Sequence, residues 1–389
     1  MTEISDDILA AIEQAIGPAG APVPLHEPEF GAADRTAVQD CLTSGWVSSA
    51  GPYVERFEEA LAEVTAARHV VAVVNGTAAL HICLRLAGVR PGDEVLMPSL
   101  TFVASANAVS YCDAVAHFVD SDPERLAIDP DALAAYLETV CEDTPEGTVN
   151  RMTGRSIRAL LAVHVLGVPA DMAALQELAA HYRLALVEDA AESLGSYFAG
   201  RHTGTFGIAG ALSFNGNKVI TTGGGGAVLI DDSEIAAYAR HLTTTARREG
   251  GVGFVHDEVG FNYRLPGLNA ALGRAQLDSL GDQLARKRKL AERYRAAFGS
   301  VDGATLVAEP ADGSSNHWLN GVMLDAADPM LRDQVIETTN AAGYLTRPAW
   351  TPMHLLPMYR DCPRMALPGA ERIFASLLCL PSSARLAAA

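Results

Sequence analysis

Short apolar runs and helical patterns alternate along the chain from about residue 53 to residue 265. The apolar runs are continuous instead of alternating with polar residues, which is typical of strands buried on both faces. Helical spacing of apolar residues separates several of them, as at 78–87 and 172–182. The predicted strands are 70–74, 95–97, 115–119, 160–165, 184–188, 209–214 and 227–230. This alternation predicts a mostly parallel sheet covered by helices.

The pattern changes in the last third of the chain. One long helical stretch fills residues 268–298, and shorter helical patterns follow at 330–342 and 370–378. Between them lie two segments with strand character, GATLVAEP and HWLNGVML. Long and short helices that alternate with strand-like segments predict a second, smaller α/β domain.

The chain therefore divides into two parts of the α/β class. Residues 1–265 hold an N-terminal segment and a large domain, and residues 266–389 hold the long helix and a small C-terminal domain. Proline-rich segments at 347–357 and 363–368 are predicted to be loops over a site.

Composition and charge exclude several classes of protein. The net charge is −18, from 29 basic and 47 acidic side chains, which argues against nucleic-acid binding because phosphate neutralisation needs a basic face. Apolar runs are too short to span a membrane, and the acidic N-terminus does not resemble a signal peptide, so we expect a cytoplasmic protein. The six cysteines and eleven histidines show no metal-ligand spacing, so no metal is expected.

Lys218 and Asp189 are the strongest candidates for chemistry. Asp189 follows the apolar run 184–188, and Lys218 lies between the strand-like 209–214 and four glycines, Gly223 to Gly226. Taken alone, such a lysine is more often a solvated loop residue, and the glycines alone could form a nucleotide loop, although the spacing G-x-x-x-x-G-K-[ST] is absent. Together, the lysine can form a Schiff base with an aldehyde while the aspartate keeps a pyridinium nitrogen protonated. The pair predicts pyridoxal 5′-phosphate.

Four further residues suit the phosphate and ring of that cofactor. Gly76 and Thr77 stand between a strand and a helix, where free backbone N–H groups favour an anion, although simple helix capping explains the same residues. Ser213 is placed to donate to the same phosphate, or else to neighbouring backbone. Phe102 follows a strand end and is either a core aromatic or a ring that lies flat on the pyridine.

The chain resembles a known family at several ordered motifs. The resemblance extends from about Ser44 almost to the C-terminus. The motifs are NGTAAL at 75–80, PGDEVLMPSLTFVASANAV at 91–109, EDAAESLGS at 188–196, SFNGNK at 213–218 and GFNYRL at 260–265. They resemble the DegT family, the nucleotide-sugar aminotransferases of fold type I that depend on pyridoxal 5′-phosphate. The resemblance implies that fold, with a large domain built on a mostly parallel central sheet and a smaller C-terminal α/β domain.

The resemblance also implies a role for each matched residue. In this family the lysine that matches Lys218 binds the cofactor covalently and then moves the proton, and the residue that matches Asp189 pairs with the pyridine nitrogen. The aromatic ring at the position of Phe102 stacks on the cofactor. Gly76, Thr77 and Ser213 are expected to hold the phosphate.

Two further positions of the family pattern bear on whether the protein forms a dimer and on which subgroup of the family it resembles. The asparagine that matches Asn262 reaches the phosphate from a second subunit, which implies a homodimer with shared sites. The position of Glu192 is often glutamine or histidine and hydrogen-bonds the cofactor's phenolic oxygen. Glutamate here, with SFNGNK and GFNYRL, resembles the branch of the legionaminic-acid and related N-acetylated sugar pathways.

A second set of residues is expected to contact the substrate. His164 lies in a motif-like turn and either touches the site or only stabilises the turn, while Trp46 is either a site residue or a core aromatic. The full set is Trp46, Thr101, His164, Arg264, His317 and His354.

The resemblance implies transfer of an amino group from L-glutamate to the 4-keto carbon of a nucleotide-linked 6-deoxyhexose, with a UDP-linked 2-acetamido sugar as the expected acceptor. Three alternatives stay open: a 3-keto aminotransferase, a sugar dehydratase and a non-catalytic regulator that binds the cofactor. Related dehydratases have histidine at the position of Lys218, which favours transamination.

Overall fold

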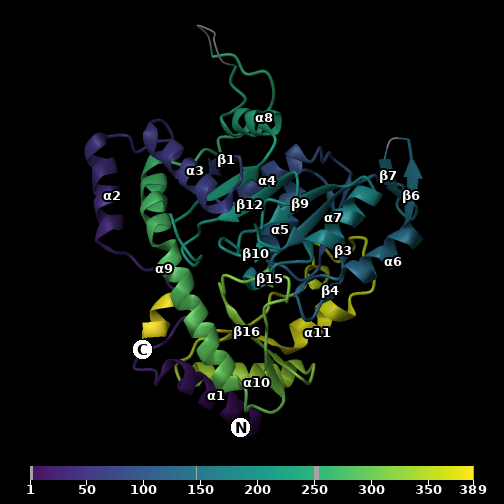
Figure 1. Cartoon of the computed structure of the whole chain (residues 1–389). Helices are drawn as coiled ribbons and strands as arrows, with labels where there is room; N and C mark the ends of the chain where they lie inside the picture. The colour runs from purple at the N-terminus through teal and green to yellow at the C-terminus, as the bar shows by residue number, and fades with distance from the viewer. Residues whose placement is uncertain (1–2, 146, 249–253, 389) are drawn as a thin grey trace.

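A seven-stranded sheet forms the centre of the large domain in the computed structural model, which describes residues 3–145, 147–248 and 254–388 (Figure 1). The strand order is β1, β13, β12, β9, β8, β2, β3. β13 is antiparallel to both neighbours, and the other six strands run parallel to one another. The bounds are β1 (His69–Val73), β2 (Glu94–Pro98), β3 (Val115–Val119), β8 (Ile157–Val163), β9 (Ala185–Asp189), β12 (Ala209–Ser213) and β13 (Gly226–Ile230). The predicted mostly parallel sheet is confirmed.

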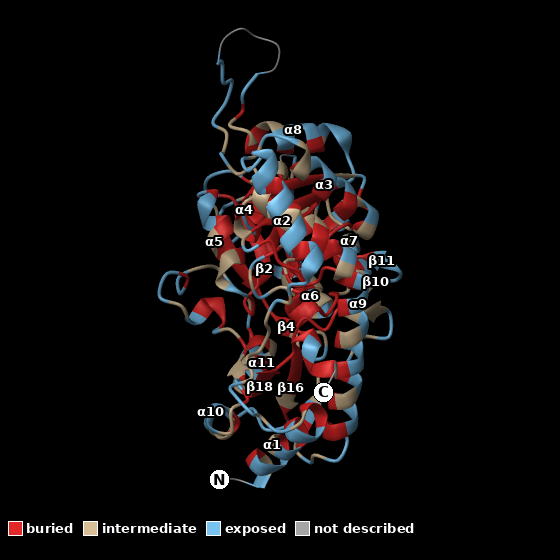
Figure 2. Ribbon diagram, turned by 90° about the vertical axis from the view of Figure 1, so that its left-hand side faces the viewer, coloured by how far each residue is buried: buried red, intermediate tan, exposed pale blue. Residues whose placement is uncertain are grey.

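Helices cover this sheet, which explains the continuous apolar runs. Every residue of β2 and β13 is buried, so both faces of these strands are inside the protein. Figure 2 shows buried residues in the middle of the domain and exposed residues on the outer surfaces. The helices are α2 (Ala32–Ser44), α3 (Pro52–Thr65), α4 (Gly76–Leu86), α5 (Val103–Tyr111), α6 (Pro130–Val140), α7 (Met172–His181) and α8 (Ser233–Thr243).

The long helix α9 (Gly267–Phe298) runs from the large domain into the small one (Figure 1). The small domain holds an antiparallel sheet in the order β14, β16, β18, β17. Its elements are β14 (Ala304–Leu306), β16 (Asn320–Leu324), β17 (Arg347–Pro348), β18 (Leu377–Leu380), α10 (Pro329–Ala341) and α11 (Pro368–Ser376).

The N-terminal helix α1 (Glu3–Ile16) packs with the small domain. Ile8 and Ile12 of α1 share a buried cluster with Leu290 and Tyr294 of α9. The first residues of the chain therefore lie in space with the C-terminal part, although the sequence division grouped them with the large domain. Periodicity shows that α1 is amphipathic but cannot show which core receives its apolar face.

The short elements complete the chain. They are β4 (Ser121–Asp122), β5 (Ala127–Ile128), β6 (Cys141–Thr144), β7 (Gly147–Asn150), β10 (Tyr197–Phe198), β11 (Arg201–His202), β15 (Gly313–Ser314), η1 (Val165–Gly167), η2 (Met353–Leu355) and η3 (Ala384–Ala388). Within the described ranges, no helix combines the length and apolar character needed to cross a bilayer.

One predicted helix ends earlier than expected. The pattern at 370–378 predicts a helix throughout, but α11 stops at Ser376 and the next four residues form β18. β18 pairs with β16 on one side and β17 on the other, so it is completely buried. A short apolar run such as LLCL has no periodicity that separates helix from strand, and the pairing decides.

Gly210 in β12 tests the close packing of the sheet. A Cβ atom there would collide with backbone atoms of Gly204, whereas a Cβ at Gly281 in α9 would meet open space. We expect Gly210→Ala to lower the melting temperature, and Gly281→Ala to raise stability by about 0.5–1 kcal/mol because alanine has the higher helix propensity. Thermal unfolding of both variants checks this. Equal melting temperatures for the two variants would contradict it.

Candidate active site

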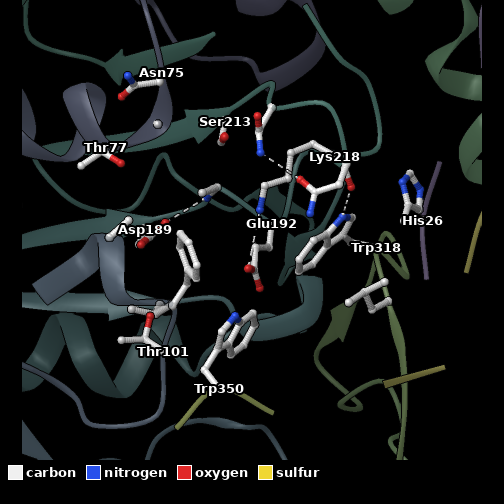
Figure 3. Close-up of a pocket in the computed structure, with 18 of the residues that line it drawn as sticks. His26, Asn75, Thr77, Thr101, Asp189, Glu192, Ser213, Lys218, Trp318 and Trp350 are labelled. Carbon is white, nitrogen blue, oxygen red and sulfur yellow. Dashed lines mark hydrogen bonds and ion pairs between the residues drawn. The ribbon is translucent and has the colours of Figure 1, made fainter. Parts of the chain in front are cut away.

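A cavity of about 450 Å³ opens at the carboxyl ends of the parallel strands (Figure 3). Asn75 and Gly76 follow β1, Phe102 follows β2, and Asp189 and Ser213 end β9 and β12. The reversed strand β13 begins at this same edge, so the glycines before it also line the cavity. Sheet topology thus gathers residues that are far apart in sequence, as expected for an α/β fold.

The N-terminus of α4 forms an anion-binding corner of the cavity. Asn75 caps the helix by accepting a hydrogen bond from the backbone N–H of Ala78 at 2.8 Å. The N–H groups of Gly76 and Thr77 remain at the open first turn, with the positive end of the helix dipole. A Cβ on Gly76 would lie 2.8 Å from the Cβ of Ser213, so only glycine allows this close approach. The corner is suited to a phosphate.

A buried carboxylate faces the centre of the cavity. The Oδ2 atom of Asp189 accepts a hydrogen bond from Ser105 Oγ at 2.7 Å, and Oδ1 accepts from the backbone N–H of Ala191 at 3.1 Å. Thr101 Oγ1 lies 2.9 Å from Ser105 Oγ and extends this chain of hydroxyl groups. Burial raises the pKa of Asp189, while these hydrogen bonds and the charge of Lys218 oppose the shift. The carboxylate is fixed in place before any ligand binds.

Lys218 lies opposite this carboxylate, between Glu192 and Trp318. Its Nζ atom is 3.6 Å from Glu192 Oε1 and 4.0 Å from the centroid of the Trp318 ring. Burial lowers the pKa of Lys218 and raises the pKa of Glu192, although each charge favours ionisation of the other. Glu192 Oε2 accepts a hydrogen bond from the backbone N–H of Leu166 at 2.9 Å. A lysine with a lowered pKa spends more time as the neutral, nucleophilic amine.

A second buried lysine, Lys287, supports the part of the cavity wall that contains Trp318. Lys287 of α9 donates hydrogen bonds from Nζ to the carbonyl oxygens of Trp318 at 3.2 Å and Ser382 at 2.6 Å. The Trp318 Nε1–H in turn donates to the carbonyl of Asn217 at 2.7 Å, next to Lys218 in the chain. The backbone N–H of Ser382 donates to the carbonyl of Leu25, which lines the cavity. Lys287 of α9 therefore links the segment of Trp318 to the segment of Ser382, and both segments help to shape the pocket.

Comparisons with known proteins agree with this geometry. A model of the DegT/DnrJ/EryC1/StrS aminotransferase family matches residues 28–389. The chain belongs to this family. This aminotransferase is 35% identical over 365 residues to a GDP-perosamine synthase of Caulobacter vibrioides, with 94% of each chain covered. It is 36% identical over 366 residues to EpsN of Bacillus subtilis, covering 93% of this chain and 91% of EpsN, whose name provisionally assigns it to the pyridoxal phosphate-dependent aminotransferases.

A solved structure supports the fold independently. The aminotransferase TlmJ from Streptoalloteichus hindustanus superposes with a TM-score of 0.83 at 32% sequence identity, covering 93% of each chain. The predicted fold type I architecture is confirmed by this likeness.

Pyridoxal 5′-phosphate is the cofactor of this aminotransferase, and the cavity fits it. The open first turn of α4 suits the phosphate, the buried Asp189 suits a protonated ring nitrogen, and Lys218 is the lysine inside the cavity. When bound, the cofactor supplies an aldehyde that accepts an amine and a ring that stabilises negative charge on the substrate's reacting carbon.

The structure brings eight of the predicted site residues into the cavity wall and leaves six outside it. The eight are Gly76, Thr77, Thr101, Phe102, Asp189, Glu192, Ser213 and Lys218. Phe102 keeps 52% of its surface exposed, so the ring is free to stack on a ligand. The six residues that do not line the cavity of their own chain are Trp46, His164, Asn262, Arg264, His317 and His354.

The three histidines predicted to contact the substrate lie near other protein groups. The Nε2 atom of the fully buried His164 is 3.1 Å from Glu188 Oε2, and its Nδ1 accepts from the backbone N–H of Ala170 at 3.1 Å, so it stabilises the turn. His354 Nδ1 is 2.7 Å from Ser99 Oγ, and His317 Nε2 is 3.6 Å from Glu309 Oε1. Motif resemblance places a histidine on a turn, but side-chain direction decides whether it faces the substrate.

Sequence analysis missed several residues that line the cavity. His26 comes from the N-terminal segment, and Trp318, Arg347 and Trp350 come from the small domain. The proline-rich segment 347–357 was predicted to lie over a site, which was the available signal for Arg347 and Trp350. His26 gave no signal because it lies before Ser44, where the resemblance to the family begins, and outside every predicted element.

The sequence predicted no metal site, and a group of possible metal ligands lies on the surface. In the described part, ligand atoms of His241, Asp257 and Glu258 lie within 4.8 Å of one another on the surface. The His241 ring hydrogen-bonds Asp257 at 2.7 Å, and Tyr238 donates to Glu258 at 3.0 Å, so polar partners already account for the cluster.

Glu192→Gln tests the charge next to Lys218. Because burial raises the pKa of Glu192, the carboxyl group keeps its proton to a higher pH than usual and loses it as pH rises through that value. Glutamine retains a donor and does not titrate. We expect the variant to keep the cofactor and most of the turnover, and to lose the alkaline decline of kcat/KM that this ionisation causes.

Measurement of kcat/KM against pH checks this, with Glu192→Leu as the control that removes hydrogen bonding. A drop of about 100-fold or more in Glu192→Gln would mean that the carboxylate itself transfers protons.

Proposed function

We propose that this aminotransferase is a sugar aminotransferase that moves the amino group of L-glutamate to the 4-keto carbon of a nucleotide-linked 6-deoxyhexose. The observation that carries the proposal is Lys218, which lies in the cavity with Asp189 across from it and Glu192 at 3.6 Å. A histidine at this position would favour dehydration, and a regulator would not need the lysine. The amine enters in a first half-reaction and leaves with the sugar in a second.

Each protein group has one task in this proposal. Asp189 keeps the ring nitrogen of the cofactor protonated, Phe102 covers the ring, and Ser213 joins the N-terminus of α4 on the phosphate. Lys218 would hold the cofactor's aldehyde and would carry the proton to and from the substrate's reacting carbon. The lowered pKa of Lys218 suits it to accept that proton near neutral pH.

The nucleotide is the least constrained part of the acceptor. The motifs SFNGNK and GFNYRL with Glu192 resemble the legionaminic-acid branch and suggest a UDP-linked 2-acetamido-2,6-dideoxy-4-ketohexose. The GDP-perosamine synthases, 34–35% identical over 87–94% of this chain, suggest a GDP-linked 6-deoxyhexose. Both acceptors are 4-keto sugars that differ at C2 and in the base, so the proposed position of amination is common to them.

We further propose that the working unit is a homodimer with shared sites. Asn262 is exposed and lies outside the cavity of its own chain, and Trp46 keeps 51% of its surface exposed. The segments on either side of residues 249–253 extend beyond α8 (Figure 1) and expose Phe254 and Val259 at 79% and 83%. Exposed apolar side chains on a projecting segment suit burial against a second copy.

A panel of nucleotide sugars tests the proposed reaction. The purified enzyme with L-glutamate should aminate 4-keto sugars linked to UDP or GDP and leave 3-keto sugars unchanged, because the amine must be delivered at C4. Mass spectrometry of the products reads the mass change and the nucleotide. Amination of 3-keto sugars alone would replace the proposal with its nearest rival, and loss of water from the sugar would identify a dehydratase. A protein that binds the cofactor but converts no substrate would be a regulator.

Subunit complementation tests the shared site. If Asn262 acts on the partner's phosphate, a dimer of Lys218→Ala and Asn262→Ala chains has one site free of both changes. Random re-association of two inactive variants should then restore about one quarter of wild-type activity, since half of the dimers are mixed and each has one intact site. If Asn262 served its own subunit, every site would carry one change and no activity would return. Each variant re-associated with itself is the control.

A further inference from the structure

His81 is a buried histidine of α4 that lies outside the cavity. Its Nδ1 atom is 3.3 Å from the hydroxyl oxygen of Tyr263, and its Nε2 atom has no hydrogen-bond partner among the described residues. Burial, helped by the charge of Arg85, lowers the pKa of His81 to about 4, so the ring is neutral at physiological pH. A buried nitrogen without a partner costs stability that a leucine would not cost. What the imidazole adds in return is the polar contact with Tyr263.

Two aromatic rings pack against this histidine. The ring centroids of His81 and Phe261 are 4.7 Å apart, and those of His81 and Tyr263 are 5.9 Å apart, both with the edge-to-face arrangement that aromatic rings favour. Phe261 and Tyr263 also stack on each other, with centroids 5.0 Å apart and planes 19° apart. Asn262 lies between them in the sequence. His81 therefore holds the residues on both sides of Asn262.

The segment of Asn262 is extended and lies along the free edge of the central sheet. β1 is the first strand in the sheet order, and Arg264 forms an antiparallel bridge with Val73, its last residue. The backbone N–H of Val74 donates to the carbonyl of Tyr263 at 2.8 Å. This pairing fixes the backbone of the segment next to the point where the chain enters α4.

The alternation of side chains in an extended segment sets the direction of Asn262. Successive side chains point to opposite sides, so Phe261 and Tyr263 share one side and Asn262 takes the other. The two rings turn toward His81 and are partly buried, whereas Asn262 is exposed and does not line the cavity of its own chain. The contact of the rings with His81 thus directs Asn262 away from its own subunit.

A change at His81 has two routes to a cofactor phosphate. One runs along α4 to the anion-binding corner of the same chain, about one turn earlier in the helix. The other runs through Phe261 and Tyr263 to Asn262 and the neighbouring subunit. Asn75 caps the first turn of α4 without His81, whereas the His81 ring touches the rings beside Asn262. The contacts favour the second route.

We propose that His81 is a positioning residue for the other site of the dimer. Its imidazole holds Phe261 and Tyr263 so that Asn262 is presented to the cofactor phosphate in the partner subunit. The proposal rests on the homodimer with shared sites that is proposed above, and it adds the residue that sets the direction of the shared asparagine.

Two variants remove the same contact from opposite ends. His81→Phe keeps an aromatic ring without a nitrogen, and Tyr263→Phe removes only the hydroxyl group. The full-length protein is freed of cofactor and titrated with pyridoxal 5′-phosphate, with absorbance as the signal. Each variant should raise the apparent Kd about 3- to 10-fold, which is the loss expected when a neutral hydrogen bond is weakened. The double variant should be no worse than either single variant, because both changes remove one interaction.

Titration with pyridoxal, which lacks the phosphate, separates positioning from general damage. All variants should bind pyridoxal as the wild type does, because Asn262 is proposed to act on the phosphate alone. An equal loss of affinity for both compounds would mean that the fold is damaged and would overturn the proposal. Unchanged affinity of both single variants for pyridoxal 5′-phosphate would overturn it as well.

The matched control is Tyr136→Phe. The Tyr136 hydroxyl oxygen lies 2.9 Å from Nε2 of the buried His117, and neither residue lines the cavity. This variant also removes a tyrosine hydroxyl from a buried histidine, so its affinity for pyridoxal 5′-phosphate should equal that of the wild type. A loss as large as that of Tyr263→Phe would show that the effect is not specific to the segment of Asn262.

Mixed dimers decide which site depends on His81. A dimer of one Lys218→Ala chain and one His81→Phe chain is purified with two different affinity tags. Only the His81→Phe chain can give the absorbance of cofactor bound to a lysine, and its phosphate would receive Asn262 from the Lys218→Ala chain, where His81 is intact. The apparent Kd of this site should therefore return to the wild-type value. A Kd that stays raised would mean that His81 acts on its own α4, and the proposal would be wrong.

A parallel mixed dimer of Lys218→Ala and Asn262→Ala chains tests the shared site by itself. A wild-type Kd at its lysine-bearing site supports Asn262 acting across the interface. If that Kd is normal while the His81→Phe mixed dimer stays weak, only the role of His81 fails. If the Asn262→Ala mixed dimer is weak too, Asn262 serves its own subunit and the shared site itself is refuted.

Discussion

A lysine that must be both buried and reactive sets the main constraint on this protein. Removing an ammonium group from water is costly, and the cavity offsets that cost for Lys218 with Glu192 at 3.6 Å and the Trp318 ring at 4.0 Å. These partners have to be held still, since a small displacement would leave the charge unpaired. Lys287, buried in α9, supplies that support through the carbonyl of Trp318. The large domain delivers the lysine, and the small domain completes its surroundings.

The sheet explains why so many groups meet in one cavity. Six parallel strands end at the same edge, so the residues after β1, β2, β9 and β12 converge although they are up to 140 positions apart, from Asn75 to Asn215. The reversed strand β13 adds its glycines at that edge, where a side chain at Gly226 would collide with the backbone of Asn75. A phosphate corner, a buried carboxylate and a lysine then lie around one volume. This is the arrangement that the family chemistry needs.

Two carboxyl groups and two basic side chains line the pocket: Asp189, Glu192, Lys218 and Arg347. Asp189 and Glu192 both feel the charge of Lys218, which opposes the rise that burial causes in their pKa values. Arg347 stacks on Trp350 and has no ion-pair partner in the described residues. In a chain with a net charge of −18, a free cation in the cavity also attracts anionic substrates against the overall field.

The sequence by itself determined the large sheet, the lysine, the aspartate and the phosphate corner. Continuous apolar runs mark strands buried on both faces, and groups placed directly after such strands must share one edge. Only the tertiary structure decided the rest. His164 and His354 turn toward Glu188 and Ser99, away from the cavity, because side-chain direction depends on the neighbours. His26 and Arg347 reach the pocket from segments more than 300 residues apart, and the docking of α1 and β18 into one core has no local signature. Those contacts are set by packing between distant segments, which periodicity cannot encode.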